Sequence, residues 1–303
     1  MNNKRVRAEL TLLLVAVLWG GGFVAVKDAL DAVTPFYMIG IRFTIAAFIL
    51  VMIFRHRVWR FPAAGIKAGL IIGFFLFAAF ALQTIGLQYT LPGKQAFLTG
   101  IYVIMVPFLY WLVRHKPPGI YAVIAAFLTL IGIALITLEE RFVLNSGDWL
   151  TLLCDIGFAA HIIAIDKYAK HYDAVVLAIV QMLFAGVMGF VCGGLFEPSF
   201  AGKITADAWF PLLYMTLFST MAAFLLQNIA QCHVKPTQSA IILCLESVFG
   251  AILSVIIMQE PFGASKIIGC AVIFLAVVLA QIKPTVKTRT IKSVQDIPSV
   301  SHK

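Results

Sequence analysis

Long apolar runs separated by short polar connections dominate the pattern of the chain. A helix that spans a membrane requires about 20 predominantly apolar residues. Ten segments meet this requirement, and glycine, proline and polar residues mark the connections between them. The pattern therefore predicts an all-α integral membrane protein. Its ten predicted transmembrane helices cover residues 8–27, 36–54, 67–89, 94–113, 119–138, 148–166, 174–195, 209–233, 237–258 and 265–282.

The composition excludes an ordinary soluble protein. Of the 303 residues, 61% are hydrophobic and 12% are charged, and the mean hydropathy is +0.97. Soluble domains have roughly 45–50% apolar and about 25% charged residues. In a soluble protein the net charge of +9 would favour nucleic-acid binding, but here the basic residues lie between the spans. We therefore expect the lipid bilayer, and no nucleic acid, as a partner.

The lysine and arginine residues predict the orientation. With the N-terminus inside, 17 of them fall on cytoplasmic segments and five outside, and Arg42 alone lies within a span. Because cytoplasmic loops are enriched in positive charge, both termini are predicted to be cytoplasmic, in a bacterial-type inner or plasma membrane. The N-terminal run lacks a cleavage site and is expected to be retained as the first helix. The polar tail from Lys283 is expected to be disordered.

The chain contains an internal repeat. AAFALQTIGLQYTLPGKQA at 78–96 aligns with AAFLLQNIAQCHVKPTQSA at 222–240, so Gln83 meets Gln227. A slightly shorter offset aligns the earlier part of each half, and the loop between the second and third spans absorbs the difference. The sequence thus predicts a first five-helix repeat over residues 1–138, a second over 139–282, and a basic cytoplasmic tail over 283–303.

The odd number of spans in each half has a topological consequence. A half with five spans begins and ends on opposite sides of the membrane, so the second half is inverted relative to the first. Inverted repeats are typical of transporters, in which substrate binds near the midplane between the halves. We therefore expect alternating access, in which the two halves exchange inward-facing and outward-facing roles.

Three charged residues lie well inside predicted spans, away from the span ends. At 1.5 Å per residue, Glu246 lies about 14 Å deep, near the midplane. Arg42 lies about 9 Å and Asp155 about 10 Å from the outer surface. The shared depth allows an ion pair between Arg42 and Asp155 if their spans are neighbours, which would lower the cost of burying both charges.

Each of these residues admits more than one interpretation. Arg42 forms a structural ion pair, extends to the interface, or binds a substrate carboxylate with its fork of donors. Asp155 is structural, binds a substrate amine, or carries a proton. Glu246 is too deep to reach the interface, so it is either hydrogen-bonded in the bundle or faces a cavity. Because burial disfavours a charged carboxyl, Glu246 is a candidate proton carrier.

Weaker candidates surround these charges. Tyr102 is the repeat partner of Glu246, and His161 lies in the middle of the sixth span. Buried amides and hydroxyls in membranes often bond neighbouring helices, and aromatic side chains often belong to the core, so structural roles stay open for all of them. The predicted substrate-binding residues are Trp19, Phe23, Gln83, Tyr102, Phe158, His161, Gln227, Asn228 and Glu246. Gly20-Gly21-Gly22 either bends the first span or lets a neighbouring helix approach closely.

Signatures of enzymes and of metal sites are missing from the sequence. No nucleophile elbow, HExxH, P-loop or GxGxxG motif occurs. The five cysteines are scattered without a CxxC motif, and we interpret them as small buried side chains. We therefore expect no catalytic residue, no metal and no cofactor.

Four motifs carry a resemblance to a known family. They are WGGGFVAVK at 19–27, IRFTIAA at 41–47, GDWLTLLCDIGFAAHIIAIDKYA at 147–169 and LESVFGAILSVIIMQEPFGASKIIGCAVI at 245–273. In their order and spacing they resemble the EamA-type ten-span transporters of the drug/metabolite transporter superfamily, over residues 8–282. The resemblance implies transport, most often export, of small metabolites. The chain departs from the family pattern at Ser247, where members often have proline, and at Lys116, where many have glutamate.

Together these observations predict a secondary transporter, gradient-driven or facilitative, that exports a small amphipathic metabolite such as an amino acid or a drug-like compound. Protons are a candidate coupling ion, and a monomer and a homodimer are both open. One alternative is a transporter of organic anions, nucleotide-sugars or phosphates from the same superfamily, which would require several cations at the site. Another is an integral-membrane enzyme or an assembly partner.

Overall fold

A computed structural model describes residues 3–30, 33–90, 92–115, 117–137, 144–198, 206–258 and 263–281. The predicted tail over 283–303 and the side chain of Phe23 lie outside what is described. Helices account for every regular element within these residues. In chain order they are α1 (Asn3–Leu30), α2 (Pro35–Val58), α3 (Ala63–Leu87), α4 (Pro92–Thr99), α5 (Tyr102–Arg114), α6 (Ile120–Thr137), α7 (Ser146–Tyr168), α8 (Ala174–Phe196), α9 (Ala206–Tyr214), the π-helical segment η1 (Met215–Ala222), α10 (Ala223–Gln231), α11 (Pro236–Leu243), α12 (Glu246–Met258) and α13 (Ala264–Gln281).

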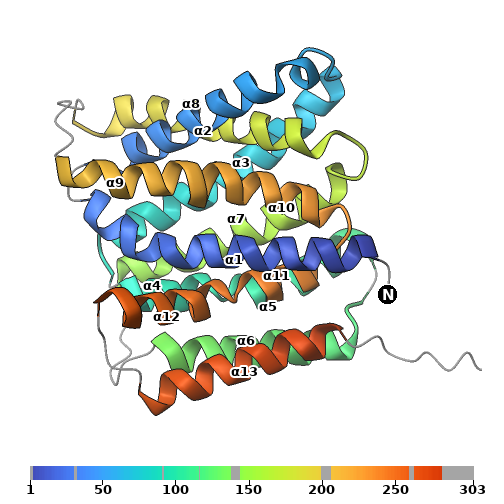
Figure 1. Cartoon of the computed structure of the whole chain (residues 1–303), viewed down its shortest axis with the longest axis vertical. Helices are drawn as coiled ribbons and strands as arrows, with labels where there is room; N and C mark the ends of the chain where they lie inside the picture. Colours follow the sequence, from blue (N-terminus) through green and yellow to red (C-terminus); the bar gives the residue numbers. More distant parts are fainter. Residues whose placement is uncertain are drawn as a thin grey trace, which may run out of the picture.

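These helices form a bundle of ten spans, and the predicted all-α membrane fold is confirmed. Within the described residues, eight helical stretches are long and apolar enough to cross a membrane, and Ile120–Ile136 is a shorter apolar helix. The bundle is completed by α1 (Figure 1). We call the end of the bundle at which Asn3 lies the N face. The N face is predicted to be cytoplasmic, and the other end is the opposite face.

Two of the ten spans are broken in the middle. The fourth span stops at Thr99 and resumes at Tyr102, and the ninth stops at Leu243 and resumes at Glu246. Under the repeat alignment, Tyr102 corresponds to Glu246, so both breaks fall at the same repeat position. At both breaks tighter i→i+3 hydrogen bonds replace part of the helical pattern: the N–H of Gly100 donates to Phe97 over 3.0 Å, and that of Leu245 donates to Ile242 over 3.1 Å. The breaks are therefore local changes of helical winding within continuous spans.

The packing pairs the two halves in a regular way. The second span packs on the seventh (α2 on α8), and the fifth packs on the tenth (α6 on α13). The third span packs on the sixth (α3 on α7), while the first packs along the whole eighth span (α1 on α9, η1 and α10). In Figure 1 the α2–α8 pair and the α6–α13 pair lie at opposite ends of the long axis, with α1 between them. The remaining spans therefore surround the centre of the molecule.

Close contact between α1 and α12 explains the glycine triplet. The helix α1 is continuous through these glycines, and a Cβ atom added to Gly20 would lie 2.8 Å from the carbonyl oxygen of Glu246 and from the backbone nitrogen of Gly250. No side chain other than hydrogen fits at this distance. The interpretation as a site of close approach is therefore confirmed, and it brings Trp19 next to the break in the ninth span.

A carboxylate on the opposite face joins the second and seventh spans. Thr34 donates its hydroxyl to Glu197 over 2.6 Å, and the backbone N–H groups of Phe36 and Tyr37 donate to the same carboxylate at 2.8 and 3.2 Å. The first N–H groups of a helix have no partner within the helix, and a negative charge near them is stabilising. Glu197 therefore caps α2 from a neighbouring helix.

We expect Glu197→Ala to lower the free energy of unfolding by about 1–3 kcal/mol, because two backbone donors and a hydroxyl lose their acceptor. Thermal unfolding in detergent measures this change. Glu197→Gln is an intermediate variant, because its single amide oxygen replaces only one of the two accepting carboxylate oxygens, so we expect a smaller loss than in the alanine variant. Equal stability of the alanine variant and the wild type would contradict the capping role.

Candidate functional site

A central cavity lies where the two broken spans meet the other helices. Its volume is ≈ 130 Å³. Among the predicted site residues, eight line it: Trp19, Arg42, Gln83, Tyr102, Phe158, His161, Gln227 and Glu246. Leu87, the last residue of α3, and Gln95 also line it, so the cavity extends toward the opposite face. The structure therefore brings most of the predicted residues together around one space.

Arg42 is held in the cavity wall by a neutral environment. Its Nε atom donates to the hydroxyl of Thr220 over 2.8 Å, and its guanidinium lies 5.1 Å from the ring of Phe43 and 5.0 Å from that of Phe80. The side chain is buried, and its terminal Nη groups have no hydrogen-bond partner among the described residues. Aromatic faces stabilise a cation without neutralising it. Arg42 therefore offers two unused donor groups to the cavity.

The ion pair between Arg42 and Asp155 is not formed. No ion pair joins them within the described residues, because the second span packs on the seventh rather than on the sixth. Asp155 is fully buried, does not line the cavity, and has one carboxyl oxygen without a hydrogen-bond partner. Its other oxygen lies 4.0 Å from the sulfur of Cys154. Arg42 lines the cavity and Asp155 does not, so the predicted ion pair is wrong.

Glu246 is the first residue of α12 and lines the cavity. Its carboxyl group makes no hydrogen bond or ion pair to a described residue, and Arg42 is not among its partners. Tyr102, the first residue of α5, occupies the matching place in the other half, and its hydroxyl also lacks a partner. The two helix breaks thus present one acidic and one phenolic side chain at equivalent positions.

Four aromatic rings form one wall of the cavity. The rings of Trp19 and Phe224 lie 5.4 Å apart, and those of Phe158 and Phe80 also lie 5.4 Å apart. The rings of Phe80 and Phe224 are 5.9 Å apart and link the two pairs. The indole N–H of Trp19 donates to the carbonyl of Ser219 over 2.9 Å, which fixes the ring. An apolar group of a ligand would pack against this wall.

Two neutral polar residues line the cavity and also bond a neighbouring helix. His161 lines the cavity, and its Nε2 atom shares a hydrogen bond of 2.7 Å with the amide oxygen of Gln181. Gln83 also lines it and donates to the hydroxyl of Thr99 over 3.3 Å, which joins the third and fourth spans. Buried amides thus act as links between helices here as well as lining groups.

The repeat partners Gln83 and Gln227 differ in the hydrogen bonds that their side-chain amides make. Gln227 is buried, lines the cavity and has an amide oxygen without a partner. Asn228 donates to the carbonyl of Phe224 within its own helix over 2.8 Å and does not line the cavity. Asn228 was predicted to contact substrate, and its position one residue along the helix turns it away.

Several lining residues were not predicted from the sequence. Gln95, Thr99 and Ser219 line the cavity, and Thr220 holds Arg42. Ser219 and Thr220 lie in η1, whose wider π-helical turns are frequent at functional sites but have no sequence signature. Phe80 and Phe224 are repeat partners, so the repeat alignment could have identified them. All five cysteines are free, and no group of three or more potential metal ligands occurs in the described part of the chain.

The N face is closed by polar contacts between helix ends. Asp166 is buried at the end of α7 and pairs with Lys170 and, at 3.7 Å, with Arg114 at the end of α5. On the other side of the bundle, the guanidinium of Arg5 donates to Gln281 over 2.6 Å and to Gln238 over 3.4 Å. These contacts join the spans between the cavity and the N face, and the cavity itself extends toward the opposite face.

Sequence comparisons match the chain to a family of membrane proteins. The model of the EamA-like transporter family matches residues 6–138 and again residues 145–281. An uncharacterized transporter of Archaeoglobus fulgidus is 31% identical over 280 residues, which cover 92% of this chain and 87% of the relative. An uncharacterized transporter of Bacillus subtilis is 27% identical over 295 residues, which cover 92% and 88%.

A solved crystal structure supports the same fold. It matches with a TM-score of 0.78 and covers 91% of this chain and 96% of the solved chain. The two sequences are 18% identical, so the likeness concerns the fold alone. The overall helical fold is therefore shared with a protein of distant sequence.

Proposed function

Because the chain belongs to the EamA-like transporter family, we propose that it is a secondary transporter that exports a small amphipathic zwitterion, such as an amino acid, by alternating access. The family has a ten-helix membrane fold, and its named relatives are transporters rather than enzymes. The chain is accordingly a multi-pass transporter of the cell membrane, and a small molecule is its substrate. The substrate class, the direction and the mechanism belong to the proposal.

One observation carries the choice of substrate class. Among the described residues that line the cavity there are one guanidinium, Arg42, and one carboxyl, Glu246, and the two are not paired with each other. Arg42 has donors free for a carboxylate, and Glu246 has acceptors free for an ammonium group. A molecule that carries both charges satisfies both residues, and an apolar side chain on it packs against the aromatic wall. Zwitterionic amphipathic metabolites meet all three requirements.

The charges of the cavity argue against the alternative of a larger anion. Among its described lining residues, Arg42 alone is a permanent cation, and Glu246 would repel a phosphate when ionised. Nucleotide-sugars and organic phosphates carry two or more negative charges, and their recognition relies on clusters of cations. The zwitterion is therefore the better match.

Alternating access is supported by the regular packing of the two halves. The third span packs on the sixth as the eighth packs on the first, and these pairs exchange under the repeat alignment. The ring pair Trp19–Phe224 likewise exchanges with Phe158–Phe80, and both have the same spacing. Such a relation fits two inverted repeats over residues 1–138 and 139–282, with the cavity between them. The contacts at the N face then represent the closed gate of an outward-facing state.

Flux measurements in proteoliposomes test the substrate class. Uptake is compared for a zwitterionic amino acid with an apolar side chain, for the corresponding amine and for the corresponding carboxylate, each with and without a pH gradient. We expect the zwitterion to be transported at least tenfold faster than either singly charged analogue. Equal rates for the three compounds would overturn the zwitterion proposal. If none of the three compounds is transported, the assignment as a transporter of this substrate class is wrong.

The gate at the N face gives a separate prediction. Asp166→Asn removes the charge that holds Arg114 and Lys170, so we expect this face to open more often and transport from that side to start more readily. Labelling of the half-buried Cys232, whose thiol donates to the carbonyl of Ala169, reports the opening. The rate of labelling of Cys232 is expected to rise severalfold in Asp166→Asn. Arg57→Gln, which removes an exposed ion pair to Asp173 at the same face, serves as control and is expected to leave the rate unchanged.

A further inference from the structure

A second, apolar groove lies on the outside of the bundle, where α3 and α8 meet below the end of α2. Its volume is ≈ 410 Å³. Only apolar side chains line it in the described structure, among them Val58, Phe61, Ile66, Leu70, Val180 and Phe184. Ile66 and Leu70 are 45% and 41% exposed, so the groove opens to the surroundings of the protein rather than to the central cavity. In a membrane, these surroundings are lipid.

The groove is long and narrow. On α8 it is lined by residues from Val176 to Val187, a rise of about 16 Å along the helix. Beneath it the two helices touch, because a Cβ atom added to Gly69 would lie 2.6 Å from a methyl carbon of Val180. The contact at Gly69 therefore forms the floor of the groove, and Val180 lines it. Its length and its apolar lining suit a single acyl chain.

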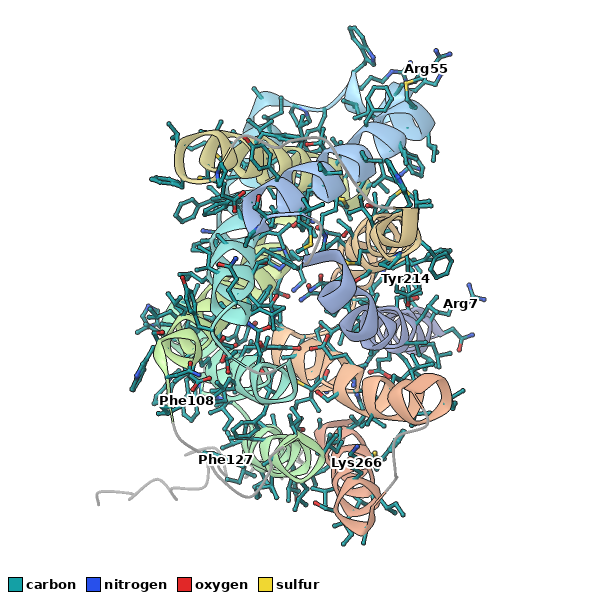
Figure 2. All side chains as sticks on the ribbon, turned by 90° about the vertical axis from the view of Figure 1, so that its left-hand side faces the viewer. Arg7, Arg55, Phe108, Phe127, Tyr214 and Lys266 are labelled. Atoms are coloured by element: carbon teal, nitrogen blue, oxygen red, sulfur yellow. The ribbon has the colours of Figure 1, made fainter. Side chains whose placement is uncertain are left out.

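Positive charge surrounds one end of this groove. Arg55, Arg57, Arg60 and Lys67 all lie at the N face, on or next to the segment between α2 and α3. One of them is neutralised, because Arg57 pairs with Asp173 at 3.4 Å. Arg55, Arg60 and Lys67 are exposed and have no ion pair with a described residue. Figure 2 shows Arg55 at the top of the molecule, with its side chain directed away from the bundle.

The charges and the groove are adjacent in sequence as well as in space. Arg60 directly precedes the lining residue Phe61, and Lys67 directly follows the lining residue Ile66. Trp59 is 88% exposed beside them, as expected for an aromatic residue at the membrane interface. The enrichment of lysine and arginine in cytoplasmic loops accounts for positive charge at this face. It does not account for an apolar groove that ends among these charges.

We propose that this groove binds an anionic phospholipid, with one acyl chain along α8 and the phosphate between Arg60 and Lys67. The site is separate from the central cavity and does not depend on the substrate that the cavity takes. Clustered lysine and arginine residues near a membrane surface favour anionic headgroups. A zwitterionic phospholipid of equal chain length would fill the groove equally well but would carry no net charge for the cations.

Native mass spectrometry of the purified full-length protein tests this site. The probes are phosphatidylglycerol and phosphatidylcholine with identical acyl chains. We expect preferential retention of phosphatidylglycerol by the wild type, and a fall of roughly tenfold in its affinity for the double variant Arg60→Gln/Lys67→Gln. A second variant, Leu183→Trp, fills the groove without changing charge and is expected to reduce retention of both lipids.

The matched control is the double variant Arg7→Gln/Lys235→Gln, which removes two exposed basic residues from the same face but away from the groove. Affinity for phosphatidylglycerol is expected to persist in it. Equal retention of the two lipids by the wild type, or equal losses in the two double variants, would overturn the proposal. An affinity for glycerol phosphate equal to that for phosphatidylglycerol would also overturn it, because it would show that the acyl chain contributes nothing.

Discussion

Transport of a zwitterionic substrate is expected to fall at least a hundredfold in Arg42→Gln. The free Nη groups of Arg42 offer the cavity's only permanent positive charge among the described lining residues, and the substrate carboxylate would accept from both. Hydrogen bonds to charged groups contribute about 1.5–3 kcal/mol each, so two of them account for roughly a hundredfold or more. Initial rates of uptake into proteoliposomes measure the loss.

The conservative variant and a second substrate separate recognition from folding. Arg42→Lys keeps the charge but loses the planar fork, and we expect it to recover only part of the rate. The corresponding amine, which has no carboxylate, should be transported by Arg42→Gln at about the wild-type rate. If the variant loses the amine and the zwitterion equally, Arg42 has a structural role through Thr220 and does not recognise the carboxylate.

Accumulation driven by a pH gradient is expected to disappear in Glu246→Gln. Glu246 lines the cavity at the start of α12 and has no cation or hydrogen-bond donor among the described residues to hold it ionised. An ionised carboxyl inside a membrane is costly, so on this proposal Glu246 carries a proton that the substrate ammonium displaces. Replacement by an amide keeps the shape but removes both the proton and the charge.

Counterflow distinguishes coupling from substrate binding. Exchange of labelled for unlabelled substrate at equal pH requires no proton movement, so Glu246→Gln should retain part of it while losing pH-driven uptake entirely. Tyr102→Phe is the matched control, because Tyr102 occupies the equivalent position in the other half and also lines the cavity. If pH-driven accumulation in Glu246→Gln equals that of the wild type, Glu246 is not the proton carrier.

The sequence predicted the ten spans because apolar length and turn residues are local properties. It did not predict the two helix breaks, and the reason differs between them. The first break contains Gly100, a weak helix former, but the second falls at Cys244 and Leu245, neither of which interrupts a helix by itself. The packing of Gly20 against the backbone at Glu246 and Gly250 is a long-range contact that no local pattern contains.

The sequence predicted a depth for each charged candidate but not the direction in which its side chain points. A rise of 1.5 Å per residue placed Glu246 near the middle of the membrane and Arg42 and Asp155 at one level. Depth is one coordinate only, and the rotation of each helix and its neighbours decide which side chains meet. Since α2 packs on α8, Arg42 contacts Thr220 and the aromatic wall, whereas Asp155 lies behind the cavity.

Unlike residues at equivalent positions give the central cavity an electrical polarity. The repeat partner of Arg42 is Gln181, and that of Glu246 is Tyr102, so each charge has a neutral counterpart across the axis. A carrier made of two identical subunits would present the same groups to a substrate in either of two orientations. On the proposed mechanism a zwitterionic substrate would have one favoured alignment in this cavity. The divergence of the two halves would then give the inward-facing and outward-facing complexes different energies.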